Sequence, residues 1–369
     1  MTEVIIKSAE YEYDILKPVV FEFMNALGGK RISQDSRVII KPNLLAAAVP
    51  EKAIVTHPMV IRAVVEFVNE RGARPQISDS PAIGTFQKIL DESGITQAIK
   101  GLNVECREFK GAVNVDIGRP FNSIEIARDA MEADFLINLP KLKTHAQMKL
   151  TLGVKNTFGC IIGMKKPEWH LRSGVDRELF ADLLARISKA VKPDITIMDG
   201  ILSMEGQGPG KGGTPRKLGV VMGSRSPAAI DIAVCKMIGL DPLSLLTNKM
   251  SALTGPAIED VTITGELPAI SEFELPVMSP AVFGPVALHS FIRKHLVQRP
   301  VADPSLCRMC GECRKYCPAH AITQDKKKIY FDYDTCIRCY CCLEVCPHGA
   351  LTAKESMPGS VVRRLLRIR

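Results

Sequence analysis

The chain has 369 residues, a formal net charge of +8 and 46% hydrophobic residues, which is typical of a packed globular protein with two or three domains. No apolar stretch is long enough to cross a bilayer, and the N-terminus lacks a signal-peptide core, so we expect a cytoplasmic protein without a transmembrane segment. Aromatic residues make up only 5% of the chain and the lysines are dispersed, which argues against nucleic-acid binding.

Residues 1–275 are predicted to form an α/β domain, because Val- and Ile-rich runs alternate with amphipathic helical stretches. The predicted strands cover 37–41, 76–78, 134–138, 194–198 and 218–222. One predicted helix starts at Pro58 and ends before Gly72, and three further helices are predicted over 84–92, 177–190 and 228–238. This alternation favours a mostly parallel sheet with flanking helices, which binds ligands at the carboxyl ends of its strands.

Polar residues follow the first two of these strands. Lys41 and Asn43 leave the first strand, and we expect both to line a crevice at the sheet edge. Asp79 ends the next strand, where a carboxylate contacts a ribose or a metal ion, or caps the helix that follows. The sequence leaves these three readings of Asp79 open.

The segment 136–163 is rich in cations, and it follows the strand predicted at 134–138. The polar residues that we expect around a pocket here are Lys141, Lys143, His145, Lys149, Lys155 and Asn156. Such a concentration of positive charge suits a carboxylate or a phosphate, with the lysines holding the anion and Asn43 and Asn156 orienting it. His145 is a candidate for proton exchange near neutral pH. The alternative is an ordinary exposed basic loop.

Residues 199–214 are rich in glycine. Three of these glycines formally match a dinucleotide fingerprint, but Pro209 interrupts the pattern and no helix opens there. The phosphate-loop pattern also fails, because Gly212 follows Lys211 in place of Ser or Thr. We interpret the segment as a mobile lid, with Glu205 as a candidate acid, base or polar contact. A plain flexible surface loop is the alternative.

A proline-rich stretch over 276–302 is predicted to be a linker to a small C-terminal α+β module over 303–352. Eight cysteines in this module form two copies of the pattern C-x2-C-x2-C-x3-C-P, namely Cys307, Cys310, Cys313, Cys317 and Cys336, Cys339, Cys342, Cys346. This is the spacing of two-cluster bacterial ferredoxins, in which the fourth cysteine of each run ligates the other 4Fe–4S cluster. Paired C-x2-C units also bind zinc, which is the alternative.

Because the fourth cysteine of each run ligates the other cluster, the pattern predicts two ligand sets. The first is Cys307, Cys310, Cys313 and Cys346, and the second is Cys336, Cys339, Cys342 and Cys317. We interpret Cys341 as a non-ligand, because using it would break the two-residue gap after Cys339. The cysteines outside the runs suggest no disulfide framework, and exposed low-potential clusters favour a reducing, anaerobic cell.

The last residues, 353–369, form a basic tail with arginines at 363, 364, 367 and 369. Apolar residues alternate with these arginines, so the tail is either a short amphipathic helix on an anionic surface or partner, or a solvated end.

Residues 35–245 resemble the domain-of-unknown-function family numbered 362, which is often fused to a bacterial-type ferredoxin. The segments that carry the likeness are 39–44, 56–58, 78–84, 139–145, 152–156 and 230–231. The Lys-x-Lys-Thr-His run at 141–145 is the most specific of them. The resemblance implies an α/β fold and an association with iron–sulfur redox chemistry, but it supplies no reaction.

Together these patterns favour an iron–sulfur oxidoreductase. Electrons would pass from a ferredoxin or reductase, through two 4Fe–4S clusters, to an anionic substrate or cofactor in the α/β crevice, while His145 or Glu205 moves protons. A non-catalytic electron carrier or assembly factor that docks a protein partner is the first alternative. Non-redox chemistry with structural clusters is the second. No flavin or nucleotide motif is readable, which leaves both cofactors open.

Overall fold

The computed structural model describes residues 2–253, 255, 257–278, 291, 292, 295–356, 359 and 361. The arginines of the basic tail and residues 279–290 of the proline-rich segment lie outside the described residues. Within the described residues, no helix is both long and apolar enough to cross a membrane.

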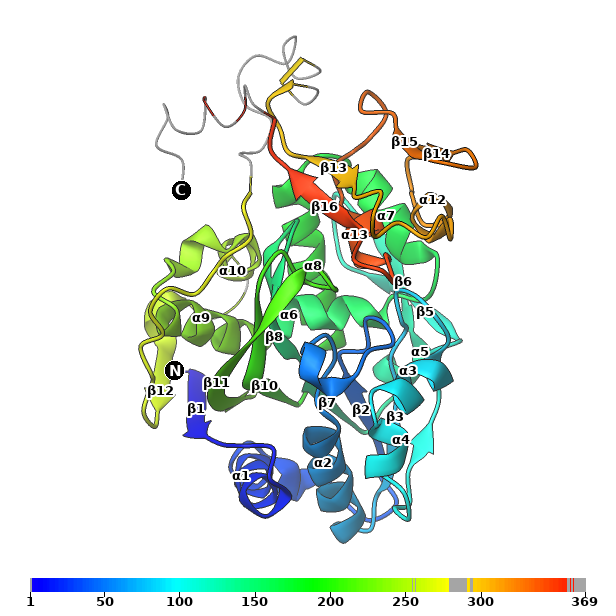
Figure 1. Ribbon diagram of the computed structural model, residues 1–369. Helices are drawn as coiled ribbons and strands as arrows, with labels where there is room; N and C mark the ends of the chain where they lie inside the picture. The colour runs from blue at the N-terminus through cyan, green and yellow to red at the C-terminus, as the bar shows by residue number, and fades with distance from the viewer. Residues whose placement is uncertain are drawn as a thin grey trace.

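A ten-stranded sheet forms the centre of the molecule (Figure 1). Its main path runs in the order β12 (Val261–Thr264), β1 (Thr2–Ser8), β11 (Gly213–Ser224), β10 (Ile195–Gly206), β7 (Phe135–Leu139), β2 (Arg37–Pro42), β3 (Arg74–Ile77) and β4 (Glu105–Cys106). The strands from β10 to β4 are mutually parallel, whereas β11 runs antiparallel to both of its neighbours. This arrangement confirms the predicted mostly parallel sheet.

Helices cover both faces of the sheet, and the alternation of side chains along β2 shows how. Val38 and Ile40 are buried with α1 (Tyr13–Ala26) and α2 (Pro58–Glu70), whereas Ile39 is buried with α8 (Arg177–Val191) on the other face. Successive residues of a strand point to opposite faces, so a strand buried on both sides is apolar at every position. A third cluster packs α9 (Pro227–Met237) against β1 and β11.

The segments predicted as a basic loop and a lid are largely strands. Residues that follow β7 form β8 (Lys141–His145), which pairs in parallel with β10 and antiparallel with β9 (Lys149–Thr151). The lid prediction was wrong for most of 199–214, because β10 continues to Gly206 and β11 begins at Gly213. Only the turn 207–212 connects them, and the two strands form a long antiparallel hairpin.

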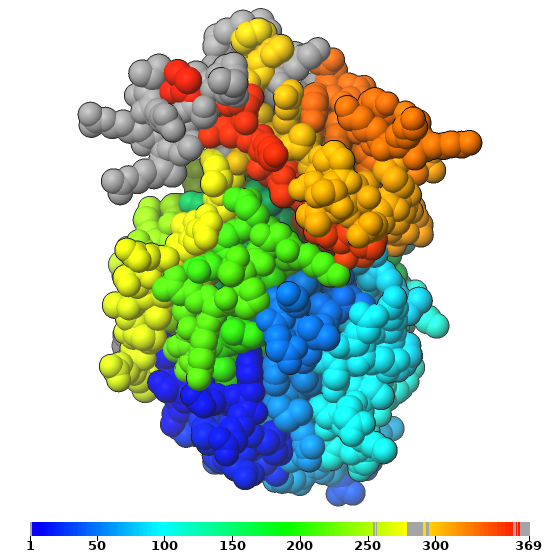
Figure 2. Space-filling view, in the orientation of Figure 1, coloured from blue at the N-terminus to red at the C-terminus, as the bar shows by residue number. Residues whose placement is uncertain are grey.

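The C-terminal module consists of two short antiparallel strand pairs and two short helices. β13 (Arg299–Ala302) pairs with β16 (Leu351–Lys354), and β14 (Ile322–Gln324) pairs with β15 (Ile329–Phe331). The helices α12 (Glu312–Lys315) and α13 (Cys341–Glu344) occupy equivalent places within the two cysteine runs. The module packs on the α/β body in the space-filling view (Figure 2).

The turn of the β10–β11 hairpin contacts this module. A Cβ atom at Gly210 would lie 3.5 Å from the Glu344 carbonyl oxygen, and one at Gly349 would lie 3.1 Å from Lys211 Cβ. The glycine-rich turn therefore brings the backbones of the two parts close together.

Candidate functional site

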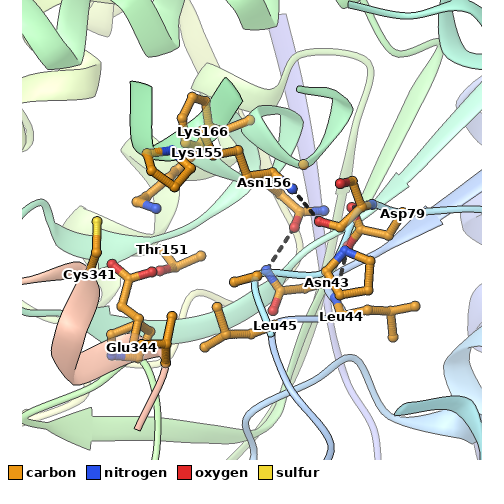
Figure 3. A pocket seen from close by; sticks show the side chains of 18 of the residues that line it. Asn43, Leu44, Leu45, Asp79, Thr151, Lys155, Asn156, Lys166, Cys341 and Glu344 are labelled. Atoms are coloured by element: carbon orange, nitrogen blue, oxygen red, sulfur yellow. Dashed lines mark hydrogen bonds between the residues drawn. The ribbon is translucent and has the colours of Figure 1, made fainter. Parts of the chain in front are cut away.

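A cavity of about 260 Å³ lies between the carboxyl ends of the parallel strands and the C-terminal module. On the α/β side it is lined by the segments that follow β2 and β3, by β8 and β9, and by α6 (Gly153–Asn156) and α7 (Lys165–Ser173). On the other side it is lined by Tyr316, Cys341, Glu344 and Val345. Figure 3 shows Cys341 and Glu344 of α13 across the cavity from Asn43 and Asp79.

Most of the residues predicted from the sequence line this cavity. They are Lys41, Asn43, Asp79, Lys143, His145, Lys155 and Asn156. Lys141, Lys149 and Glu205 do not line it. Parallel strands bring the residues after β2, β3 and β7 to one edge of the sheet, which is why positions about 100 residues apart meet here.

A chain of hydrogen bonds fixes the floor of the cavity. Lys143 Nζ donates to Asn43 Oδ1 at 2.8 Å and to the Ile54 carbonyl oxygen at 2.5 Å. Asn43 Nδ2 donates to Asn156 Oδ1 at 2.8 Å, and Asn156 Nδ2 donates to Asn138 Oδ1 at 2.7 Å. In this series of hydrogen bonds, the side-chain amides of Asn43 and Asn156 each have both a donor partner and an acceptor partner. Their orientations are therefore fixed before any ligand binds.

Lys41 and Asp79 form a buried ion pair beside this chain, with 2.8 Å between Nζ and Oδ1. Asp79 also accepts hydrogen bonds from the backbone amides of Leu44 and Ser80, at 2.9 Å each. The helix that follows, α3 (Phe86–Glu92), is capped by Thr85, which contradicts the interpretation of Asp79 as its cap. The carboxylate instead ties together the two segments that leave β2 and β3.

Two further lysines, Lys155 and Lys166, line the cavity. Lys166 donates to the Ser80 carbonyl oxygen, whereas Lys155 makes no hydrogen bond or ion pair within the described residues and stands 5.9 Å from the Phe158 ring centroid. Burial lowers the pKa of Lys143 to about 7 and that of Lys166 to about 8, and it also lowers the pKa of Lys155. Crowded, desolvated ammonium groups favour the binding of an anion, which would raise these pKa values again.

His145 connects the two parts of the molecule. Its Nδ1 accepts hydrogen bonds from the backbone amides of Gln147 (3.1 Å) and Met148 (3.2 Å), so the proton of the neutral ring is on Nε2, which lies 2.9 Å from Glu344 Oε1. Burial lowers the pKa of His145 to about 4. The imidazole is therefore neutral at pH 7, outside the range expected of a group that exchanges protons near neutral pH. Its Nε2 and Glu344 Oε1 are in contact, but neither atom has a partner with hydrogen-bond geometry among the described residues.

The sequence did not identify several other lining residues. Thr151 Oγ1 and His170 Nδ1 are buried and have no hydrogen-bond partner among the described residues, so both remain available to a polar ligand. Lys166 and His170 lie on α7, beyond the cation-rich segment 136–163, and no sequence pattern pointed to Glu344. Its place between Cys342 and Cys346 is the only sequence signal that it has.

The three predicted residues outside the cavity have structural partners. Lys149 Nζ donates to the Ser244 carbonyl oxygen at 3.3 Å. Lys141 Nζ lies 2.8 Å from Asp199 Oδ2 in a fully buried ion pair, and it also donates to Tyr11 Oη at 2.9 Å. Glu205 accepts from Arg216 Nη1 at 2.7 Å and from the Glu274 backbone amide at 3.1 Å. Lys141 and Glu205 stabilise the β10–β11 region and its neighbours.

The cysteines of the module lie together in two groups. Burial, together with the nearby Cys346, Cys310 and Cys307, raises the pKa of Cys313 to about 11. The pKa of Cys317 is also raised by burial, with Cys339 and Cys336 as its thiol neighbours. A hollow lined by Cys307, Cys310, Cys313 and Cys346 separates the thiols of the first group. These two donor sets suit iron, which thiolates ligate in 4Fe–4S clusters.

Comparison with known proteins gives the same two parts. A family model described as a domain of unknown function (DUF362) matches residues 38–236, and a 4Fe–4S dicluster domain matches residues 299–347. The thylakoid-associated protein sll1697 of Synechocystis is 35% identical over 309 residues, which are 81% of this chain and 96% of that protein.

Two shorter matches cover less than two thirds of the relative's own length. Hydrogenase-4 component A of Escherichia coli is 38% identical over 16% of this chain and 29% of its own length. Pyruvate synthase subunit PorD of Methanocaldococcus jannaschii is 38% identical over 15% of this chain and 64% of its own. Among solved structures, the lactate racemase apoprotein of Thermoanaerobacterium thermosaccharolyticum aligns over 61% of this chain and 55% of its own, with 13% identity and a TM-score of 0.40.

Proposed function

Because this chain belongs to the DUF362 family and carries a 4Fe–4S dicluster domain, we propose that it transfers electrons between its iron–sulfur module and a small anion in the cavity. The observation that carries the proposal is the composition of the cavity wall. Lysines and asparagines from the strand ends face Cys341 and Glu344, which lie inside the second cysteine run. When bound, the clusters supply one-electron chemistry.

The cavity favours a compact anionic ligand. Its volume of about 260 Å³ lies just below the range of drug-sized sites, which fits a metabolite-sized molecule and not a dinucleotide. Lys155 has no competing ion-pair partner among the described residues, so it is the first candidate to contact the anion. Lys143 and Asn43 are already oriented by each other and would hold a second polar group.

Protons for a reduced substrate would come from the lysines. A group whose pKa lies near the working pH is the most effective acid, and Lys143 and Lys166 have pKa values of about 7 and about 8. His145 would instead hold the two domains in register through Glu344. Glu205 and Lys141 have no part in this scheme, because neither lines the cavity.

The proposal is tested by mass spectrometry of small molecules released from protein purified from its native cell without oxygen. We expect a stoichiometric anionic metabolite from the wild type, and its loss from Lys155→Gln and Lys143→Gln. Lys88→Gln is the matched control, because Lys88 is exposed on α3 and lies outside the cavity.

An empty cavity in protein with intact, reducible clusters would count against the proposal. It would favour the alternative of an electron carrier or assembly factor that acts on a protein partner alone.

A further inference from the structure

The two cysteine groups differ in their surroundings. The second group lies on the cavity side, since Cys341 stands between Cys339 and Cys342, Tyr316 precedes Cys317, and both Cys341 and Tyr316 line the cavity. In the first group Cys310 is exposed to solvent. In Figure 1 this group's helix, α12, lies with β14 and β15 at the outer edge of the molecule, whereas α13 lies closer to the sheet.

The surface around the exposed group is basic. We define the outer basic face as six exposed side chains on the first cysteine run, on α12 and on the β14–β15 turn, namely Arg308, Arg314, Lys315, Lys326, Lys327 and Lys328. α12 lies against the end of β14, because a Cβ atom at Gly311 would be 3.5 Å from Gln324 Oε1. Ile329, next to Lys328, lines the same hollow as Cys307 and Cys310.

No ion pair neutralises this face among the residues that the structure describes. The nearest turn carboxylate, Asp325, is occupied by the backbone amides of Lys327 and Lys328 and by Tyr330 Oη. Two apolar side chains are exposed beside these residues. Leu306 (48% exposed) lies two positions before Arg308, and the ring centroid of Tyr330 (47% exposed) lies 5.5 Å from Lys328 Nζ. A mainly cationic surface with exposed apolar side chains suits a transient contact with an acidic protein.

We propose that the outer basic face docks an acidic one-electron carrier protein, which exchanges electrons with the iron–sulfur centre held by Cys307, Cys310, Cys313 and Cys346. Each docking event would oxidise the carrier by one electron and reduce the module by one electron, without a proton or a leaving group. The inference rests on the proposed electron-transfer function and adds the entry surface and the charge of the partner. Unpaired lysines steer an acidic partner over distances set by the Debye length.

The test is a stopped-flow measurement of module reduction by a purified acidic ferredoxin reduced beforehand. The variant reverses three charges on the turn, with Lys326→Glu, Lys327→Glu and Lys328→Glu together. The control makes the same charge change on the α/β domain with Lys30→Glu, Lys88→Glu and Lys100→Glu, at exposed positions. Reduced methyl viologen replaces the ferredoxin in a second series, and iron and sulfide analysis verifies cluster content in every protein.

At about 0.01 M salt, where the Debye length is about 30 Å, we expect the turn variant to react at least about 10-fold more slowly than the wild type. At about 1 M salt the two rates should converge, and viologen should reduce all proteins alike. Equal rates for the turn variant and the wild type at low salt would overturn the proposal, as would an equal loss in the control. Because none of these substitutions touches the cavity, metabolite retention stays a separate readout of the proposed function.

Discussion

Replacing Gly159 with alanine is predicted to displace the Lys41–Asp79 ion pair at the edge of the cavity. The new Cβ atom would lie 2.3 Å from Asp79 Oδ1 and 2.5 Å from Lys41 Nζ, about 1 Å inside ordinary contact. Both charged side chains are buried, with exposures of 1% and 5%, and the backbone amides of Leu44 and Ser80 hold the Asp79 carboxylate, so moving it breaks existing hydrogen bonds. The pair must therefore separate or the backbone must shift.

The expected cost follows from these two possibilities. Overpacking a core costs about 1–3 kcal/mol, and breaking a buried ion pair costs about 3–5 kcal/mol, so Gly159→Ala should lose at least about 1 kcal/mol of unfolding free energy. Urea unfolding followed by circular dichroism, without oxygen, measures the change. Gly111→Ala is the control, because its Cβ would meet nothing closer than 3.8 Å. An unfolding free energy of Gly159→Ala within about 0.5 kcal/mol of the wild type would refute the reasoning, since surface substitutions stay within that range.

Three further predictions concern the lysines and the off-pattern cysteine. The affinity for an anion should fall at least about 10-fold between pH 6 and pH 9, because Lys143 and Lys166 lose their protons over this range. Calorimetry with sulfate, whose charge is constant over this range, measures the affinity. An affinity that does not change with pH would contradict the role of these lysines in anion binding. Lys141→Met should cost about 3–5 kcal/mol because it leaves the Asp199 carboxylate buried and unpaired, and Asp199→Asn in the same chain should restore part of the loss in thermal unfolding. Cys341→Ser should retain the iron and sulfide content of the wild type, whereas Cys339→Ser should lose a cluster by electron paramagnetic resonance; equal losses would make Cys341 a ligand.

The sequence predicted the centre of the sheet better than its edges. β2 and β7 are buried on both faces, so their continuous apolar runs stood out. β1 was missed because it alternates buried and exposed residues near the N-terminus. The β10–β11 hairpin was mistaken for a lid because its turn is rich in glycine and proline, although the flanking residues are paired on both sides of an irregularity between Gly200 and Leu202.

The candidate site was predictable where sheet topology alone decides it. Lys41, Asn43 and Asp79 follow neighbouring parallel strands, so they share one edge. Lys141 lies two residues before Lys143 on the same strand, but its side chain does not reach the cavity. Asp199 lies opposite Lys141 in the strand register and forms an ion pair with its ammonium group. The sequence could not predict that Glu344 lines the cavity, because no sequence pattern indicates how the C-terminal module packs on the α/β domain.

The most direct test of the central claim is a single-turnover experiment without oxygen. The protein is reduced, mixed with the anionic small-molecule fraction released from the wild type, and followed by the return of the oxidised-cluster absorption. We predict rapid reoxidation of the wild type and a rate at least about 10-fold lower for Lys155→Gln at the same cluster content, since the lost cation would contact the anion directly. Reoxidation that is absent from the wild type, or identical in the two proteins, would contradict electron transfer through this cavity.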